Sequence, residues 1–229
     1  MLNQQQILDI TLKTQSNLDN FVVGDNQELV DTLSKILMSA DENMMYIWGE
    51  SGVGKTHLLH GLCQLSRLQR QSIAYIPMSL PEINIQYLQS LENVPIICID
   101  DIHLIASKPD WQLAYFHLYN QIRDRGHKLL VSANAPPSRI DIALSDLRTR
   151  FAWGLVYQVQ GLDDRGKSMA LKQQAHARGF ELSDQVIQYL LSHYSRDTHF
   201  LFSILNKLDQ ASMAAQRKIT IPFVKKILD

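Results

Sequence analysis

The sequence predicts an α/β fold in which helices cover both faces of a parallel sheet, followed by a small all-helical domain. From about residue 25 to residue 159, apolar strand-like runs alternate with helical stretches, which is the usual pattern of such a sheet. A glycine-rich loop at residues 49–56 connects the first apolar run to a helical stretch. After residues 160–164 the strand signals vanish and only helical segments remain.

The individual elements follow from the same patterns in chain order. Short apolar runs bounded by turn residues predict strands at 45–48, 72–77, 95–100, 128–133 and 154–158. Helical periodicity predicts helices at 28–39, 56–70 and 111–125, and a shorter one near 141–150. In the second region we expect helices at 164–178, 183–194, 198–216 and 221–228. Ser183 suits the N-cap of one of them, and Gly179 suits a C-terminal stop.

The composition narrows the class of protein. With 22 basic and 23 acidic residues, the formal net charge of -1 gives no general attraction to nucleic acid or to anionic membranes. The two cysteines, Cys63 and Cys98, lie apart and do not suggest a disulfide framework. No stretch approaches the roughly 18 apolar residues of a membrane span, and the first 20 residues are too polar for a secretory signal. We therefore expect a cytoplasmic protein.

The glycine-rich loop reads G-E-S-G-V-G-K-T, a complete G-x-x-x-x-G-K-[ST] motif between a strand and a helix. That setting builds an anion site from unpaired backbone N–H groups at the helix N-terminus. Gly49, Gly52 and Gly54 let the backbone approach phosphates, Lys55 should reach the β- and γ-phosphates, and the Thr56 hydroxyl should bind Mg²⁺. The alternative, an ordinary glycine turn, is disfavoured by the strand before the loop and the helix after it.

Two carboxylates end the third predicted strand, about 45 residues after the loop. We expect Asp100 to hold Mg²⁺ and Asp101 to polarise an attacking water, although Asp is shorter than the Glu that would suit this task. The alternative is a buried strand with a solvated acidic end. Ser132 and Asn134 end the next strand, where open α/β sheets bind ligands, so either could sense a γ-phosphate or orient a water. An ordinary turn at Ala135-Pro136-Pro137 is the alternative for that segment.

Two arginines, Arg148 and Arg150, precede the last predicted strand in the sequence L-R-T-R-F-A-W-G. A guanidinium offered from there to the nucleotide of another subunit can stabilise the charge on a transferring γ-phosphoryl group. The alternative is a surface salt bridge, which is the common role of an exposed arginine.

Several ordered strings carry a family resemblance: N-F-V-V-G at 20–24, the glycine-rich loop, I-C-I-D-D-I at 97–102, S-A-N-A-P-P at 132–137, L-R-T-R-F-A-W-G at 147–154 and A-A-Q-R-K-I-T-I-P-F-V-K-K-I-L at 214–228. The whole chain resembles the AAA+ module of the DnaA family, and within it the Hda regulators most closely. The resemblance implies a P-loop AAA+ module at residues 21–160, a helical lid at 161–229 and a clamp-binding segment within 1–20. Hda chains stop where this chain stops, before the DNA-binding domain of DnaA, so initiator activity is not expected.

The resemblance also implies roles for individual residues. Arg150 takes the arginine-finger position, acting in trans, beside the catalytic candidates Asp101 and Asn134. His199 occupies the slot of a lid arginine that contacts the nucleotide, with Arg196 one helical turn away as the alternative. The residues expected around the nucleotide are Phe21, Val22, Val23, Gly49, Glu50, Ser51, Gly52, Val53, Gly54, Lys55, Thr56, His57 and His199.

The family also predicts a short peptide that docks on the DNA polymerase sliding clamp. The matching residues are Ile7, Leu8, Asp9, Ile10, Thr11 and Leu12. Their apolar alternation suits an extended peptide in a groove, but Ile7 stands in the place of the usual glutamine, and Gln6 is one position early. An ordinary chain terminus is the alternative.

These features together predict a negative regulator of replication initiation that binds ADP or ATP with Mg²⁺. With the DNA-loaded clamp it would stimulate hydrolysis of the ATP bound to DnaA, touching DNA only through the clamp and hydrolysing little ATP itself. The sequence leaves a homodimer open. The alternative function is a stand-alone AAA+ ATPase that loads or remodels a replication partner, in the manner of DnaC-like helicase loaders.

Overall fold

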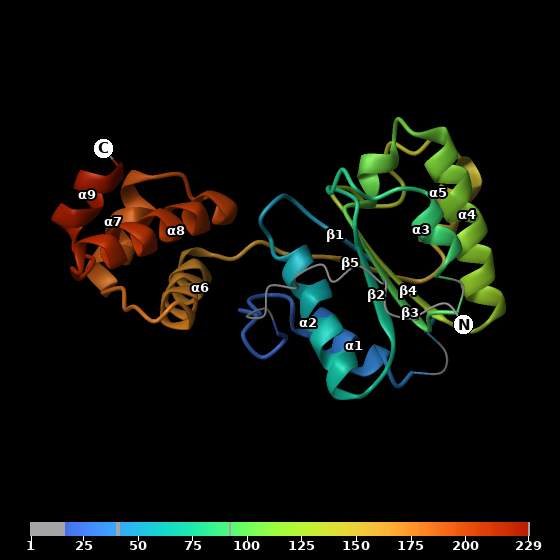
Figure 1. Ribbon diagram of the computed structural model, residues 1–229, viewed down its shortest axis with the longest axis horizontal. Coiled ribbons are helices and arrows are strands. Elements are labelled where there is room, and N and C mark those ends of the chain that lie inside the picture. Colours follow the sequence, from blue (N-terminus) through green and yellow to red (C-terminus); the bar gives the residue numbers. More distant parts are fainter. Residues whose placement is uncertain (1–16, 40–41, 92, 229) are drawn as a thin grey trace. The chain divides into compact units, whose positions relative to one another are not determined.

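A computed structural model of the chain describes residues 17–39, 42–91 and 93–228 (Figure 1). The described chain forms two compact units. The first contains Asn26–Glu50 and Gly54–Gln160 with the segment that ends at Phe21, and the second contains Val22–Asp25, Ser51–Val53 and the chain from Gly161 onward. The predicted clamp peptide at residues 7–12 lies outside the described residues. No helix of the described chain is long and apolar enough to cross a membrane.

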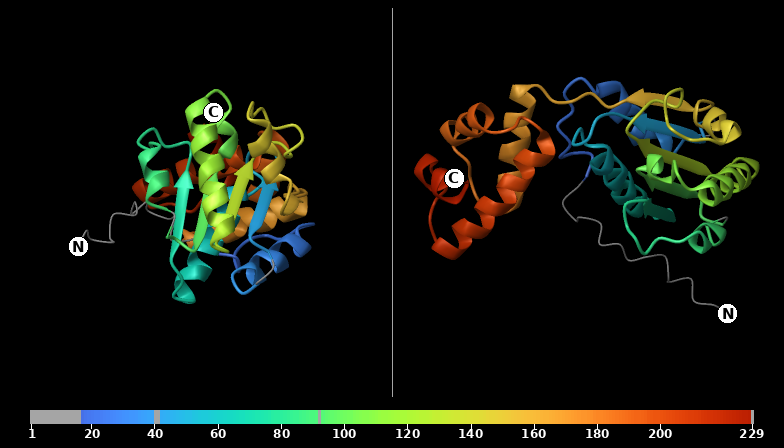
Figure 2. Two further views of the ribbon diagram at one scale, coloured as in Figure 1. Left: turned by 90° about the vertical axis from the view of Figure 1, so that its right-hand side faces the viewer. Right: turned by 90° about the horizontal axis from the view of Figure 1, so that it is seen from above.

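The first unit is built on a parallel sheet of five strands in the order β2-β3-β4-β1-β5. The strands are β1 (Met44–Trp48), β2 (Ile73–Pro77), β3 (Ile96–Asp100), β4 (Lys128–Ala133) and β5 (Leu155–Gln158). Each forms where the sequence predicts it. The central strands β1, β3 and β4 are buried almost throughout and read as apolar runs, whereas the edge strand β5 alternates between half-buried and exposed residues. Figure 2 shows them side by side.

The strand register brings the polar residues of the site to one edge of the sheet. Pro77 pairs with Asp100, Ile99 with Val131, and Trp48 with Ala133. The strands are parallel, so the carboxyl ends of β1, β3 and β4 lie next to one another. This edge is where ligands bind in open α/β sheets.

Helices cover both faces of this sheet (Figure 1). On one face lie α1 (Gln27–Ile36) and α2 (Lys55–Leu68), and on the other lie α3 (Gln86–Gln89), α4 (Pro109–Asp124) and α5 (Ser145–Phe151). The helix predicted near 141–150 begins at Ser145 instead, after an extended Leu144, and continues to Phe151. The sequence did not predict α3 or the 3-10 helix η1 (Ile102–Ile105), because such short helices leave too few residues to show a period.

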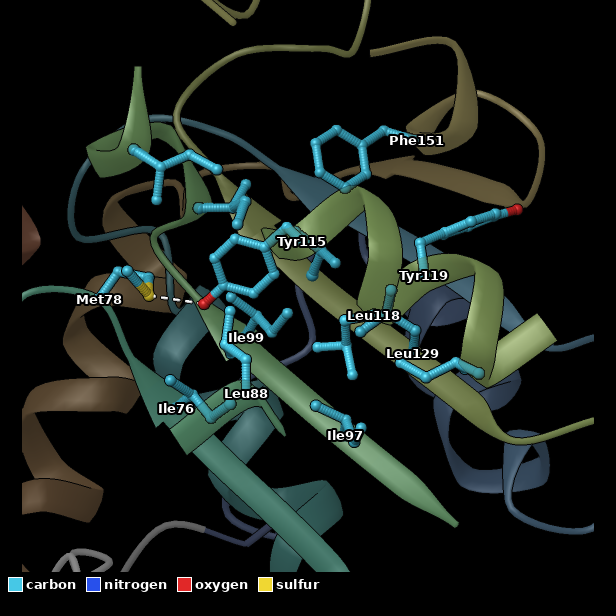
Figure 3. Close-up of a cluster of buried hydrophobic side chains, with 14 of the residues drawn as sticks. Ile76, Met78, Leu88, Ile97, Ile99, Tyr115, Leu118, Tyr119, Leu129 and Phe151 are labelled. Carbon is cyan, nitrogen blue, oxygen red and sulfur yellow. Dashed lines mark hydrogen bonds between the residues drawn. The ribbon is translucent and has the colours of Figure 1, made fainter. Parts of the chain in front are cut away.

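The core on the α4 face is a cluster of buried apolar side chains (Figure 3). Tyr115 and Leu118 of α4 pack there with strand residues such as Ile97, Ile99 and Leu129. The Tyr115 hydroxyl donates to the sulfur of Met78 at 2.8 Å. This packing fixes α4 against β3 and β4, and so fixes the surface that α4 shares with α5.

The second unit is helical, as predicted, with α6 (Asp164–Ala177), α7 (Asp184–His193), α8 (Thr198–Ala215) and α9 (Ile221–Leu228). The Ser183 hydroxyl accepts from the Val186 N–H and caps α7, and Gly179 adopts φ +84° after α6. Helical spacing of apolar residues predicts a core of Met169, Leu190, Leu191, Leu201, Leu205 and Leu208. The five leucines belong to the buried cluster of this unit, but Met169 does not, since it is 48% exposed.

Candidate functional site

The glycine-rich loop has the backbone conformation that its sequence predicts. Gly52 and Gly54 have φ values of +80° and +104°, which residues other than glycine rarely adopt. A Cβ on Gly54 would also lie 2.8 Å from Cε2 of Phe21. Helix α2 begins directly after Gly54, at Lys55. The loop therefore presents the free N–H groups of a helix N-terminus, which is an anion-binding arrangement.

The Lys55 ammonium is hydrogen-bonded to the backbone of this loop. Its Nζ donates to the carbonyl oxygens of Gly49 and Glu50, both at 2.8 Å, and the residue is only 8% exposed. Burial lowers the pKa of Lys55, while the charges of Asp101 and Asp100 act in the opposite direction. An ammonium bound only to carbonyl dipoles can exchange them for a phosphate, which is a stronger partner.

Asp100 is the centre of a hydroxyl network. Its Oδ2 accepts from the Thr56 hydroxyl and from the Tyr75 hydroxyl, both at 2.7 Å, and its Oδ1 accepts from the Ser132 hydroxyl. Asp100 itself is buried. Three elements of the first unit, α2, β2 and β4, thus fix one carboxylate, and the bond to Thr56 brings the two predicted Mg²⁺ ligands together.

Tyr75 is the member of this network that the sequence analysis did not identify. It pairs in register with Cys98, two residues before Asp100, so Tyr75 and Asp100 lie on one face of the sheet. Its half-buried ring packs edge-on against His60 with 4.6 Å between ring centroids. Burial and the charge of Asp100 raise the pKa of Tyr75 well above its usual range. The hydroxyl is therefore a permanent donor to Asp100.

The donor set fits Mg²⁺. One hydroxyl and one carboxylate, 2.7 Å apart, offer hard oxygen ligands, and Mg²⁺ in nucleotide sites takes few protein ligands beside water and phosphate. In the described ranges no cluster of three or more His, Cys, Asp or Glu side chains could hold a metal. Thr56 and Asp100 would hold the ion beside phosphate and water ligands, as part of a nucleotide complex.

Asp101 leaves the strand in a left-handed conformation, with φ 59° and ψ 47°. Its N–H donates to the Ser132 hydroxyl at 2.8 Å. Burial and the neighbouring charge of Asp100 raise the pKa of Asp101, opposed by His103 and Lys55. Nδ1 of His103 lies 4.0 Å from its carboxylate, and burial is the main factor that lowers the pKa of His103.

The two polar residues at the end of β4, Ser132 and Asn134, have different environments. Ser132 is fully buried and bridges the Asp100 carboxylate and the Asp101 N–H, so it holds the acidic pair in place. Asn134 is exposed beyond the strand end, and among the described residues its side chain has no hydrogen-bond partner. Of the two, Asn134 is the side chain free to meet a ligand.

The segment before the sheet packs against α2 beside the glycine-rich loop, through contacts with His57. Phe21 is buried and meets His57 edge-on at 5.5 Å between ring centroids. The Nε2 of His57 lies 3.0 Å from the Asn17 carbonyl oxygen and 2.8 Å from the side-chain oxygen of Asn20. The predicted base-pocket residues thus begin next to the predicted phosphate loop, while Val22 and Val23 belong to the second unit.

Arg150 lies among aromatic rings. Its Cζ is 4.1 Å from the ring centroid of Trp153, 5.6 Å from that of Tyr119 and 5.7 Å from that of Phe116. No carboxylate of the described residues lies within 4.0 Å of its guanidinium. The alternative of an ordinary surface salt bridge therefore does not apply within the described chain.

The lid candidates occupy the first turn of α8 and the residues before it in the second unit. His199 is exposed there, and Arg196 pairs with Asp164 at 3.1 Å. Both partners of that ion pair are more than half exposed, so the pair adds little stability.

The comparisons with known proteins agree with this architecture. The family model of the bacterial DnaA ATPase domain matches residues 12–158, and that of the Hda lid domain matches residues 164–228. An uncharacterized protein of Haemophilus influenzae is 38% identical over 230 residues, which cover 100% of both chains.

Two solved structures share the fold. Domain III of the replication initiation protein DnaA from Thermotoga maritima is 20% identical with a TM-score of 0.82, over 94% of this chain and 96% of that chain. AMPPCP-bound DnaA from Aquifex aeolicus is 21% identical with a TM-score of 0.70, over 85% of this chain and 65% of that chain.

Proposed function

Because the chain belongs to the DnaA-type AAA+ family and carries a lid of the Hda type, we propose that it is a negative regulator of replication initiation. It binds ADP or ATP with Mg²⁺ and, together with the DNA-loaded sliding clamp, stimulates hydrolysis of the ATP bound to DnaA. The observation that carries this proposal is the guanidinium of Arg150, which the described structure holds on aromatic rings without a carboxylate partner.

Nucleotide binding rests on the first unit. The N–H groups at the start of α2 and the Lys55 ammonium would bind phosphates, and Thr56 and Asp100 would hold Mg²⁺. The ion would neutralise charge on the β- and γ-phosphates. Phe21, buried against Gly54 and His57, would border the base, with Val22 and Val23 beside it. The Aquifex aeolicus relative, whose structure is AMPPCP-bound, supports an adenine nucleotide.

Hydrolysis by the chain itself would be slow. The residue in the water-activating position is Asp101, whose side chain is one methylene shorter than that of Glu. A general base must come within hydrogen-bond reach of the water it activates, and the shorter side chain would hold its carboxylate farther from a phosphate-bound water. Asn134 would orient that water or contact the γ-phosphate, because it is the exposed polar side chain at the end of β4.

Action on a partner would proceed through Arg150. A guanidinium supplied in trans stabilises the charge that develops on the transferring γ-phosphoryl group, which can accelerate hydrolysis about 10³- to 10⁵-fold. Residues 7–12 would bring the chain to the clamp as an extended apolar peptide. In the lid, His199 or Arg196 would contact the phosphates of the chain's own nucleotide.

The test measures hydrolysis of DnaA-bound ATP with and without DNA-loaded clamp. We expect acceleration only with the clamp, and we expect Arg150→Ala to reduce it about a thousandfold. Arg148→Ala is the matched control, because it removes the same charge from an exposed position on the same helix. If Arg150→Ala and Arg148→Ala behave alike, the proposal is wrong.

The complete phosphate loop and the acidic pair also favour a second candidate, a stand-alone ATPase that loads or remodels a partner. Rapid ATP turnover by the purified chain, dependent on Asp101 and independent of DnaA, would support that candidate. Slow turnover alone with clamp-dependent action on DnaA would support the regulator.

A further inference from the structure

Three aromatic side chains surround Arg150 on the surface shared by α4 and α5. They are Phe116 and Tyr119 of α4 and Trp153, which follows α5. We call these three residues the aromatic platform. Trp153 is 59% exposed, and it is the member closest to the guanidinium, at 4.1 Å.

The backbone places the platform residues on the same side as Arg150. Phe116 and Tyr119 are three residues apart on one helix, so they share a face. The Trp153 N–H donates to the Arg150 carbonyl oxygen at 3.1 Å, and this turn at the end of α5 brings the indole close to the guanidinium. Phe151, between them in sequence, points into the core instead and anchors the turn (Figure 3).

The electrostatics of the platform differ from those of a salt bridge. Ring faces attract a guanidinium through their quadrupole but do not neutralise it. Another arginine of this unit, Arg123, pairs with Asp124 at 3.0 Å, whereas Arg150 has no such partner among the described carboxylates. A guanidinium held by rings keeps its charge available for an incoming polyphosphate.

We propose that Trp153, supported by Tyr119 and Phe116, is a positioning residue for Arg150. The rings restrict the rotamers of the long arginine side chain before the partner arrives, so less conformational entropy is lost when the guanidinium meets the transferring phosphoryl group. This inference rests on the proposed function, since it assigns to the platform the alignment of the group that acts on the nucleotide of DnaA.

The first test is a titration of DnaA-ATP and loaded clamp with variants of the full chain, measuring maximal stimulated rate and half-saturating concentration separately. Trp153→Leu removes the ring, and we expect the maximal rate to fall about tenfold with the half-saturating concentration changed less than about twofold. Trp153→Phe keeps a ring and should retain most of the rate. Leu68→Ala, an exposed apolar site on α2 at the other face of the sheet, should match the unmodified chain.

A fall in affinity at an unchanged maximal rate would make Trp153 a docking residue only and would overturn the inference, as would an unchanged titration. Thermal melting of each variant separates a positioning effect from unfolding. The fold should persist, because Trp153 is mostly exposed.

The second readout does not require DnaA. In NMR spectra the ring current of Trp153 should move the Arg150 δ-proton resonances upfield, and Trp153→Leu should move them back. If the resonances are unshifted in the unmodified chain, the platform does not hold Arg150, whatever the hydrolysis assay gives. The resonances can instead be shifted while Arg150→Ala leaves the stimulation of DnaA-bound ATP hydrolysis intact. In that case the proposed function is wrong, and so is the positioning role of Trp153, but the stacking of Trp153 on Arg150 is confirmed.

Discussion

At the scale of single residues, Asp100 shows how the site is tuned. Its carboxylate accepts from three hydroxyls, of which Tyr75 is the one that no phosphate-loop motif includes. The Tyr75 hydroxyl bonds to the same oxygen, Oδ2, as Thr56, so it fixes the orientation of the carboxylate toward the Thr56 side. A fixed carboxylate binds an ion with less loss of freedom.

Tyr75→Phe should therefore weaken Mg²⁺-dependent nucleotide binding about fivefold, the size of one hydrogen bond, while leaving the ring and its contact with His60 in place. The measurement is calorimetric titration of ADP with and without Mg²⁺. Tyr87→Phe, which removes a hydroxyl from a half-buried tyrosine on α3, is the matched control. An equal loss of affinity with and without Mg²⁺ would show that Tyr75 acts on the phosphate loop and not on the metal ligand.

The backbone of Asp101 gives a second prediction at this scale. Asp101 has a φ of 59°. For a residue with a side chain, this backbone conformation is about 1 kcal/mol less favourable than it is for glycine. We expect Asp101→Gly to be more stable than Asp101→Ala by about that amount, measured by denaturant unfolding. Both variants lack the carboxylate, so both should lose whatever ATP turnover the chain has on its own. Equal stabilities would mean that the turn relaxes when the side chain is removed.

These residues also show what sequence reasoning could and could not find. Lys55, Thr56 and Asp100 were predicted because they belong to local motifs, and the structure brings them together. Tyr75 was missed because its role depends on the register between β2 and β3, which the sequence of either strand alone does not specify. The contact of Tyr119 with Arg150 was missed for a similar reason, since α4 and α5 meet only in the folded chain.

At the scale of elements, the link between α5 and β5 is set by Gly154. A Cβ on this residue would lie 2.2 Å from the Met44 carbonyl oxygen and 2.6 Å from the Met44 Cβ, so no side chain fits. The contact is to backbone, and the strand would have to move to accommodate it. Since Trp153 precedes this glycine directly, the same close approach fixes where the indole meets Arg150.

Gly154→Ala should thus lower the free energy of unfolding by about 3 kcal/mol, as overpacking against backbone does. Gly161→Ala is the control, because its added Cβ would lie 3.8 Å from Val53 Cγ1, an ordinary contact, and should change stability by less than about 0.5 kcal/mol. Chemical denaturation of the two variants gives both values. If Gly154→Ala lowered the free energy of unfolding as little as Gly161→Ala does, the chain before β5 would have moved to accommodate the added Cβ.

The strands were the most predictable elements and the short helices the least. All the predicted strands were confirmed. The central strands β1, β3 and β4 are buried and have an apolar signature that needs no tertiary information, whereas β5 is an edge strand whose residues are half-buried or exposed. Helix α4 begins two residues earlier than predicted, at Pro109, where proline suits the first helical turn. The four residues of α3 are held by packing of Leu88 in the core, and packing is not visible in a local pattern.

At the scale of the whole molecule, the predicted fold class is confirmed: a parallel sheet between helices and a separate helical domain. Each unit has its own buried cluster, one built on the sheet and one built from apolar side chains of α6, α7, α8 and α9. Two separate cores in one chain allow a ligand to stabilise one part more than the other.

A nucleotide that binds only the folded chain must raise its stability by mass action, by about 2.7 kcal/mol at a hundred times its dissociation constant. For a chain of 229 residues this corresponds to about 5–10 °C in melting temperature. We expect MgADP to produce such a shift and removal of Mg²⁺ with a chelator to reduce it, because in the proposed site the ion would join Thr56 and Asp100 to the phosphates. Lys55→Ala should show almost no shift, since the proposed site assigns the main phosphate contact to this buried ammonium. If MgADP raised the melting temperature of Lys55→Ala as much as that of the unmodified chain, the nucleotide would bind elsewhere on the chain. If the rise in melting temperature did not depend on Mg²⁺, the Thr56–Asp100 pair would have a purely structural role.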